Sequence, residues 1–155
     1  MDEQKTATEK DKVALPEERT VVTTHHIEIA DKPLQYTATT GILHVRNEEE
    51  KPAAGIFYVA YTKDGEDIAT RPITFCFNGG PGSCSVWLHL GAFGPKRINM
   101  VDKKSPLPNH SKLVDNEHTL LVHTDVVFID PVGTGYSRSG EEGKDEDFFN
   151  IEGDA

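Results

Sequence analysis

A glycine-rich turn at residues 78–83 is the part of this sequence whose residue types are best suited to chemistry. It has the sequence NGGPGS and follows the apolar run ITFCF, which predicts a buried strand that ends in a tight turn before a short helix. Glycines at three of the six positions allow positive φ angles and let a ligand approach the backbone without a Cβ in the way. Backbone N–H groups at such a turn can bind a carboxylate, a phosphate or a developing oxyanion.

A second segment, residues 126–137, repeats this pattern with the sequence VVFIDPVGTGYS, an apolar strand followed by a tight loop that contains glycine. Neither of the phosphate-binding patterns G-x-x-x-x-G-K-S/T and G-x-G-x-x-G can be fitted around residues 79–94, so a phosphate-binding loop is not predicted there. A strand-to-helix turn that binds no ligand remains the alternative interpretation of residues 78–83.

The chain has neither a catalytic nucleophile nor a metal site in a recognisable pattern. A sheet-based hydrolase uses a serine in G-x-S-x-G with an acid and a histidine downstream, and this chain has no such motif. Ser137 lacks the paired glycines. His25 and His26 are adjacent on a predicted strand and so face opposite ways, and His118 and His123 fit no metal-ligand spacing. We therefore predict no metal and no cofactor.

Strand signals dominate the segments that must position these two turns. Segments rich in β-branched and apolar residues predict strands at 20–29, 34–45, 54–61, 72–77 and 120–129. The first two would form a hairpin through a turn at residues 30–33. The near-continuous apolar character of residues 120–129 suits a strand that is buried on both faces of a parallel sheet.

Helix signals are sparse. Apolar spacing predicts one helix at residues 83–90, with Gly91 at its C-terminal cap, whereas residues 95–113 have the composition of an irregular loop. An antiparallel lead-in followed by strands that alternate with loops and a helix indicates an α/β fold.

Charge is concentrated at the two ends of the chain. Residues 1–19 carry six acidic and four basic residues, and residues 140–155 carry seven acidic residues and one lysine. We expect both segments to be disordered and solvated, which leaves residues 20–139 as the folded part. The net charge of −10 argues against a nucleic-acid partner, because phosphate binding needs a basic patch.

Hydropathy and cysteine content bear on location. No stretch approaches the ~20 apolar residues that cross a bilayer, and the N-terminus MDEQKTATEK does not have the pattern of a signal peptide. The sequence therefore predicts a cytoplasmic protein, or an exported one if its start is misassigned. Cys76 is expected to be a small buried hydrophobic residue, and a bridge to Cys84 across the turn is the less favoured alternative.

Two blocks of sequence resemble the serine carboxypeptidase family of α/β-hydrolases. One is FNGGPGSCS with GAFGP at residues 91–95, and the other is FIDPVGTGYS at residues 128–137. The resemblance implies the N-terminal part of an α/β-hydrolase sheet, with antiparallel lead-in strands followed by parallel strands. That sheet would be incomplete, because the serine, aspartate and histidine of the triad would lie beyond Ala155. Another α/β-hydrolase, such as a proline iminopeptidase, and a non-catalytic anion-binding module are the alternatives.

The resemblance also assigns roles to residues. Gly80, with Gly79 beside it, would form the oxyanion hole, and Asn78 would help to hold the C-terminal carboxylate of a peptide substrate. Familiar members carry acidic residues soon after this loop, but residues 83–100 contain none, which makes Lys96 or Arg97 a candidate substitute and implies an optimum nearer neutral pH. The chain as given is expected to be inactive, with an open apolar sheet edge at the strand of residues 72–77.

Overall fold

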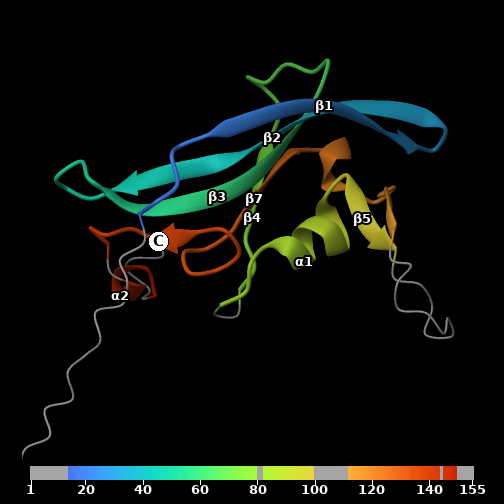
Figure 1. The fold of residues 1–155 in the computed structure, drawn as a ribbon. Coiled ribbons are helices and arrows are strands. Elements are labelled where there is room, and N and C mark those ends of the chain that lie inside the picture. The colour runs from blue at the N-terminus through green and yellow to red at the C-terminus, as the bar shows by residue number, and fades with distance from the viewer. Residues whose placement is uncertain (1–13, 80–81, 100–111, 144, 150–155) are drawn as a thin grey trace, which may run out of the picture.

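A mixed sheet forms the centre of the computed structural model, which describes residues 14–79, 82–99, 112–143 and 145–149 (Figure 1). The strands of this sheet are β1 Thr20–Ile29, β2 Lys32–Arg46, β3 Pro52–Lys63, β4 Ile73–Cys76, β7 Asp125–Ile129 and β8 Arg138–Ser139. Their order across the sheet is β1-β2-β3-β7-β4, and β8 pairs with β3. The helical segments are short.

The predicted antiparallel lead-in is confirmed, since β1, β2 and β3 pair antiparallel in sequence order. The predicted turn at residues 30–33 is too long. Ile29 already pairs with Lys32, so the turn consists of Ala30 and Asp31, which have φ angles of 48° and 61°. Two consecutive positive φ angles are typical of the two-residue hairpin turns that match the right-handed twist of the strands.

Strand β7 joins the lead-in strands to the parallel part of the sheet. It pairs antiparallel with β3 and parallel with β4. The predicted strand at residues 120–129 is too long, because Leu120–Val122 forms the 3-10 helix η2. The Thr119 hydroxyl accepts a hydrogen bond from the Leu121 N–H at 3.3 Å, which favours a helical turn at this position.

The predicted helix at residues 83–90 begins and ends later. Helix α1 covers Val86–Leu88 and continues as the π-helical segment η1, His89–Phe93, so that Gly91 lies inside the helix. The buried Asn116 amide donates to the carbonyls of Ala92 and Gly94 at 2.7 and 2.8 Å. These bonds satisfy carbonyls that a helix end leaves unpaired, which explains why the helix extends past the predicted glycine cap.

Residues 95–113 were predicted to be irregular, and this is wrong for their described ends. β5 Lys96–Asn99 pairs antiparallel with β6 Lys112–Asp115 as a separate two-stranded sheet. Residues 100–111 lie outside the described part of the chain, as do residues 1–13 and 150–155 of the predicted tails.

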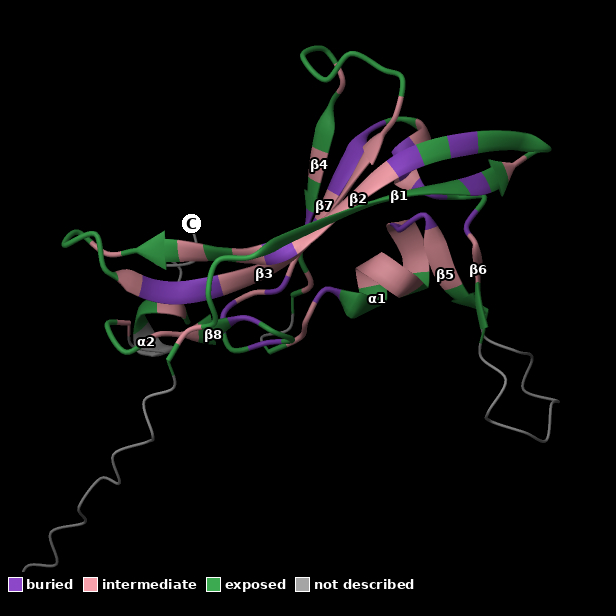
Figure 2. Ribbon diagram, turned by 45° about the horizontal axis from the view of Figure 1, so that its top comes forward, coloured by how far each residue is buried: buried purple, intermediate pink, exposed green. Residues whose placement is uncertain are grey.

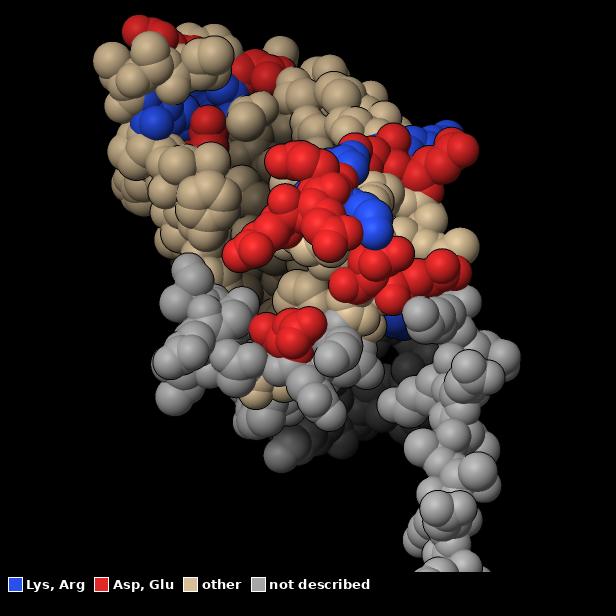
Figure 3. All heavy atoms as spheres, turned by 90° about the vertical axis from the view of Figure 1, so that its left-hand side faces the viewer, with Lys and Arg blue, Asp and Glu red and all other residues tan. Residues whose placement is uncertain are grey.

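The described parts of the chain ends lie against the main sheet. Residues 14–19 run beside β2, where the Glu18 carboxylate accepts from the His44 N–H at 2.8 Å. Near the C-terminus, helix α2 covers Asp145–Phe148, and the Gly140 N–H donates to Ala53 O at 2.7 Å. Figure 3 shows acidic side chains crowded on this side of the molecule. Lys51 forms ion pairs with Glu49 and Glu142.

The hydrophobic core lies on one face of the sheet. Val126 and Phe128 of β7 are 1% and 3% exposed and pack, with Cys76, against Leu88 of α1 and Phe93 of η1. A second cluster continues this layer below the hairpin and consists of Ile27, Leu34, Tyr36 and Leu121. The predicted burial of Cys76 is therefore confirmed, and both Cys76 and Cys84 are free thiols.

The opposite face of the sheet has no such layer among the described residues. Val22, Thr39, Ala60, Val127 and Phe75 are aligned in one row across the five strands and share this face, because in-register partners point to the same side. At the two ends of the row, Val22 is 61% exposed and Phe75 is 56% exposed, and Figure 2 shows β4 with little buried surface. The strand β4 is thus an edge strand with an exposed apolar face.

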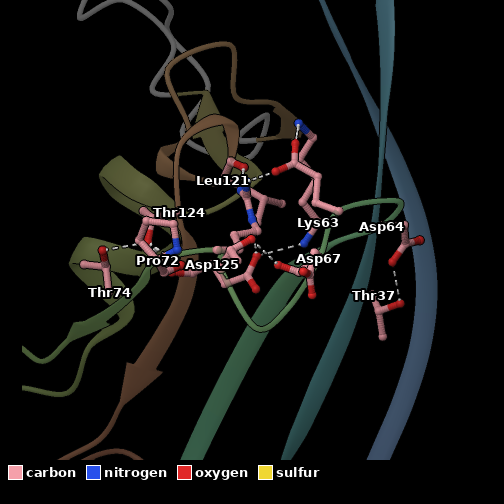
Figure 4. A network of polar contacts seen from close by, with 12 residues as sticks. Thr37, Lys63, Asp64, Asp67, Pro72, Thr74, Leu121, Thr124 and Asp125 are labelled. Carbon is pink, nitrogen blue, oxygen red and sulfur yellow. Dashed lines mark hydrogen bonds and ion pairs between the residues drawn. The ribbon is translucent and has the colours of Figure 1, made fainter.

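A buried ion pair joins the starts of β4 and β7. Arg71, whose side chain is 4% exposed, donates from Nε to Asp125 Oδ1 at 2.6 Å and from a terminal nitrogen to Leu121 O at 2.5 Å. Asp125 Oδ1 also accepts from the Lys63 N–H at 3.0 Å, and the Asp125 N–H donates to Pro72 O at 2.9 Å. Figure 4 shows Asp125 at the centre of this network, which ties β3, β4 and β7 together.

We expect Arg71→Ala to lower the free energy of unfolding by about 3–5 kcal/mol, because it leaves the Asp125 carboxylate buried without its cation. Glu66→Ala is the matched control, since Glu66 contacts the same arginine but is 41% exposed, and it should lower the free energy of unfolding much less than Arg71→Ala does. Denaturant titration measures both values. Equal costs for the two variants would contradict the structural role given to the buried pair.

We expect Phe75→Lys to weaken self-association of the chain, because a charge on an exposed edge strand opposes strand-to-strand pairing. Ile68→Lys is the control, since Ile68 is 81% exposed but lies in a loop. Light scattering over a concentration series measures the association. The edge interpretation fails if both variants associate as strongly as the unmodified chain.

Candidate functional site

The parallel pairing of β4 with β7 brings the two glycine-containing segments together. Cys76 lies opposite Phe128 in the register, so both strands end at the same edge of the sheet. The glycine loop of residues 78–83 leaves from β4, and the loop of residues 130–137 leaves from β7. Loops that follow neighbouring parallel strands are a common place for ligand sites.

The described part of the glycine loop has the backbone openness that anion binding requires. A Cβ added to Gly79 would meet no atom within 4 Å, and the same holds for Gly82, whose φ is +95°. The Asn78 N–H donates to Ser85 Oγ at 3.3 Å, which ties the start of the loop to the residue before α1. Gly80, the predicted oxyanion donor, lies outside the described residues.

The loop of residues 130–137 folds around the carboxylate of Asp130. Oδ1 accepts from the Ser85 N–H at 2.9 Å, and Oδ2 accepts from the Tyr136 N–H at 3.3 Å. Gly135 has a φ of +48°, and a Cβ on it would lie 1.8 Å from Asp130 Oδ2. Only glycine therefore lets this loop close over the carboxylate.

Ser137 links the 130–137 loop to strand β3. It is fully buried, its Oγ donates to Asp130 O at 2.6 Å, and the same Oγ accepts from the Phe57 N–H at 2.8 Å. A hydroxyl that is engaged twice and closed to solvent is not available as a nucleophile. This agrees with the sequence-based rejection of Ser137.

The structure does not bring the two predicted cationic residues to the glycine loop. Lys96 forms an ion pair with Asp115 of β6, and Arg97 lies opposite Val114 with its Nε buried and unbonded. Both belong to β5, and α1 and η1 lie between β5 and the glycine loop in the chain (Figure 1). Their role in carboxylate binding stays a prediction.

Two positions that matter most were not recognised from the sequence. Neither Asp130 nor Ser85 was singled out as a functional residue. Ser85 is 2% exposed, and its Oγ also donates to Ile129 O at the end of β7. The sequence contained one usable signal for Asp130, which directly follows the apolar run VVFI. A carboxylate at the end of a buried strand is expected to be buried too, and it then needs hydrogen-bond donors.

His89 lies under the sheet near this site. Its Nε2 is 2.6 Å from Tyr61 Oη, and its ring stacks on Phe128 with a centroid separation of 4.6 Å. Burial lowers the pKa of His89 to about 4, and the Asp130 carboxylate opposes this shift. Burial also raises the pKa of Tyr61. Both side chains are therefore neutral at physiological pH and act as packing groups.

The described residues show no group of three metal-ligating side chains, and none of their helices is long and apolar enough to cross a bilayer.

Comparison with known proteins agrees with the two motif blocks. A model of the serine carboxypeptidase family matches residues 29–150, which include both loops and every strand of the main sheet except most of β1. The chain belongs to this family. The match confirms the family resemblance drawn from the FNGGPGSCS and FIDPVGTGYS blocks.

Individual relatives point the same way. The pheromone-processing carboxypeptidase KEX1 of Saccharomyces cerevisiae, found in several strains, is 33% identical over 102 residues, which cover 64% of this chain. The match covers 12% of the length of KEX1. The similarity is thus to one part of a much longer carboxypeptidase.

The low pKa of His89 predicts that stability depends on pH. The unfolded chain takes up a proton near pH 6.5, whereas the folded chain resists it until about pH 4. The free energy of unfolding should therefore fall as the pH is lowered from 6.5 to 4, by at most about 3 kcal/mol from this group. His89→Phe keeps the ring packing and should flatten this part of the profile. Denaturant titrations at several pH values measure both profiles, and equal slopes would contradict the assignment.

Proposed function

We propose that this chain forms the N-terminal part of the α/β-hydrolase domain of a serine carboxypeptidase. The observation that carries the proposal is the glycine loop, which follows β4 at the edge where β7 also ends and leaves open space beside Gly79. Membership of the family supplies the reaction class. The serine, aspartate and histidine would come from the rest of such a domain.

In this proposal the glycine loop supplies the electrostatic part of catalysis. When a serine attacks the last peptide carbonyl, its proton passes to the histidine and the carbonyl oxygen becomes negative. The N–H groups of Gly80 and the neighbouring Gly79 would stabilise that oxyanion, and Asn78 would bind the substrate's C-terminal carboxylate. The proton then passes to the departing amine, and water hydrolyses the acyl-enzyme.

The exposed parts of the sheet support the same proposal. Among the described residues, strand β4 pairs with β7 alone, and one of its faces carries the exposed Ile73 and Phe75. Parallel strands are normally buried on both faces. A further strand and a further helical layer of a complete hydrolase domain would cover these surfaces.

A chimera tests the proposal. Residues 72–139 of this chain replace the matching segment of yeast KEX1, and labelling by a fluorophosphonate reports whether the nucleophile is still assembled. The chimera should release the last residue of a peptide that has a free C-terminal carboxylate and spare its C-terminal amide. Failure to cleave despite full labelling would refute the proposal. If the large exchange does not fold, a chimera that exchanges only residues 78–94 makes the same measurement.

Asn78→Ala in the active chimera should raise KM for the peptide acid by about 10- to 100-fold, because a hydrogen bond to a charged group is lost. The value of kcat should change less. Steady-state kinetics separates the two constants, and Asn99→Ala, at the end of β5, is the matched control. An unchanged KM would remove Asn78 from the substrate site. The 155-residue chain alone should not react with the fluorophosphonate.

A further inference from the structure

Asp130 is a buried carboxylate that the proposed reaction does not use. It is 8% exposed and directly follows the last residue of β7. Each of its oxygens accepts a backbone N–H, one from Ser85 and one from Tyr136. Its own carbonyl accepts from the Ser137 hydroxyl, which in turn holds the Phe57 N–H of β3. The backbone of Asp130 is therefore tied to β3 through Ser137, and its carboxylate binds residues 85 and 136, one on each side of the site.

Ser85 transmits this anchoring to the glycine loop. Its N–H is held by Asp130, its Oγ donates to the Ile129 carbonyl, and the same Oγ accepts the Asn78 N–H. Ser85, the buried residue before α1, is thus bonded to Asn78, the first residue of the glycine loop. Two hydrogen bonds, one to the N–H and one to the Oγ of Ser85, link the Asp130 carboxylate to the Asn78 backbone.

The fit around the carboxylate is tight. A Cβ on Gly135 would lie 2.6 Å from Asp130 Cγ and 3.0 Å from Cys84 Cβ, so the 130–137 loop lies close to the residue that follows the glycine loop. Both carboxylate oxygens of Asp130 have a backbone N–H partner. Displacement of the carboxylate would therefore move both loops.

We infer that Asp130 is a positioning residue for the glycine loop. It acts through Ser85 to fix the backbone at Asn78, the first residue of that loop. The inference rests on the proposed function only where it links Asn78 to substrate. Groups that bind a substrate must be held within a fraction of an ångström, and buried supporting bonds provide that accuracy.

Amide hydrogen exchange in the full chain tests the anchoring without any reference to activity. Asp130→Asn can offer only one carbonyl oxygen to two N–H donors, so exchange at Ser85 or Tyr136 should rise at least tenfold, and exchange at Asn78 should rise with that at Ser85. Ser85→Ala removes only the hydroxyl, and should speed exchange at Asn78 and leave Tyr136 unchanged.

Asp125→Asn is the matched control, because Asp125 is a carboxylate of similar burial at the other end of β7 that also accepts a backbone N–H. It should lower overall stability and speed exchange at Lys63, without a selective effect at Asn78. If Asp130→Asn and Ser85→Ala both leave exchange at Asn78 unchanged, or raise it only as much as Asp125→Asn does, the inference is wrong.

The link to substrate is tested separately in the KEX1 chimera. There Asp130→Asn should lower kcat/KM for the peptide acid at least tenfold while the fluorophosphonate still labels the serine. Normal kinetics with faster exchange at Asn78 would overturn the link to substrate but keep the anchoring. A chimera that is inactive before any substitution would count against the proposed function alone.

Discussion

The parallel pairing of β4 with β7 is the constraint on which the rest of this structure depends. It places the ends of two strands that are distant in sequence beside each other, and so makes one site from two glycine-containing loops. Because β7 also pairs antiparallel with β3, the same strand attaches the site to the hairpin sheet. Without this pair, the glycine loop would have no neighbour to hold its shape.

Polar groups secure this pair at both ends, by different means. At the start of the strands, the charges of Arg71 and Asp125 compensate each other in a buried ion pair. At the other end, Asp130 has backbone N–H groups as partners, which position loops with more directional control than a flexible cation provides. The Arg71–Asp125 ion pair stabilises the sheet, and the bonds of Asp130 position the two loops.

Sequence patterns predicted what depends on local interactions. The lead-in hairpin follows from β-branched alternation, and the two glycine turns follow from the positive φ angles of residues such as Gly82 and Gly135. The extended helix and the role of Asp130, which the sequence did not predict, depend on distant partners. Asn116 extends the helix by bonding to carbonyls more than twenty positions earlier, and Asp130 holds a residue 45 positions away. No local pattern encodes such contacts, so they needed the fold.

The strand order has a consequence for how the chain folds. The hairpins of β1, β2 and β3 close through short loops, which is fast. Strand β4 cannot join them directly, because β7 lies between β3 and β4 in the sheet. It must wait for a segment that the ribosome adds later, as the 54-residue separation of Arg71 and Asp125 illustrates. Such non-local pairing is slow, so we expect docking of β7 to limit the rate at which the site folds.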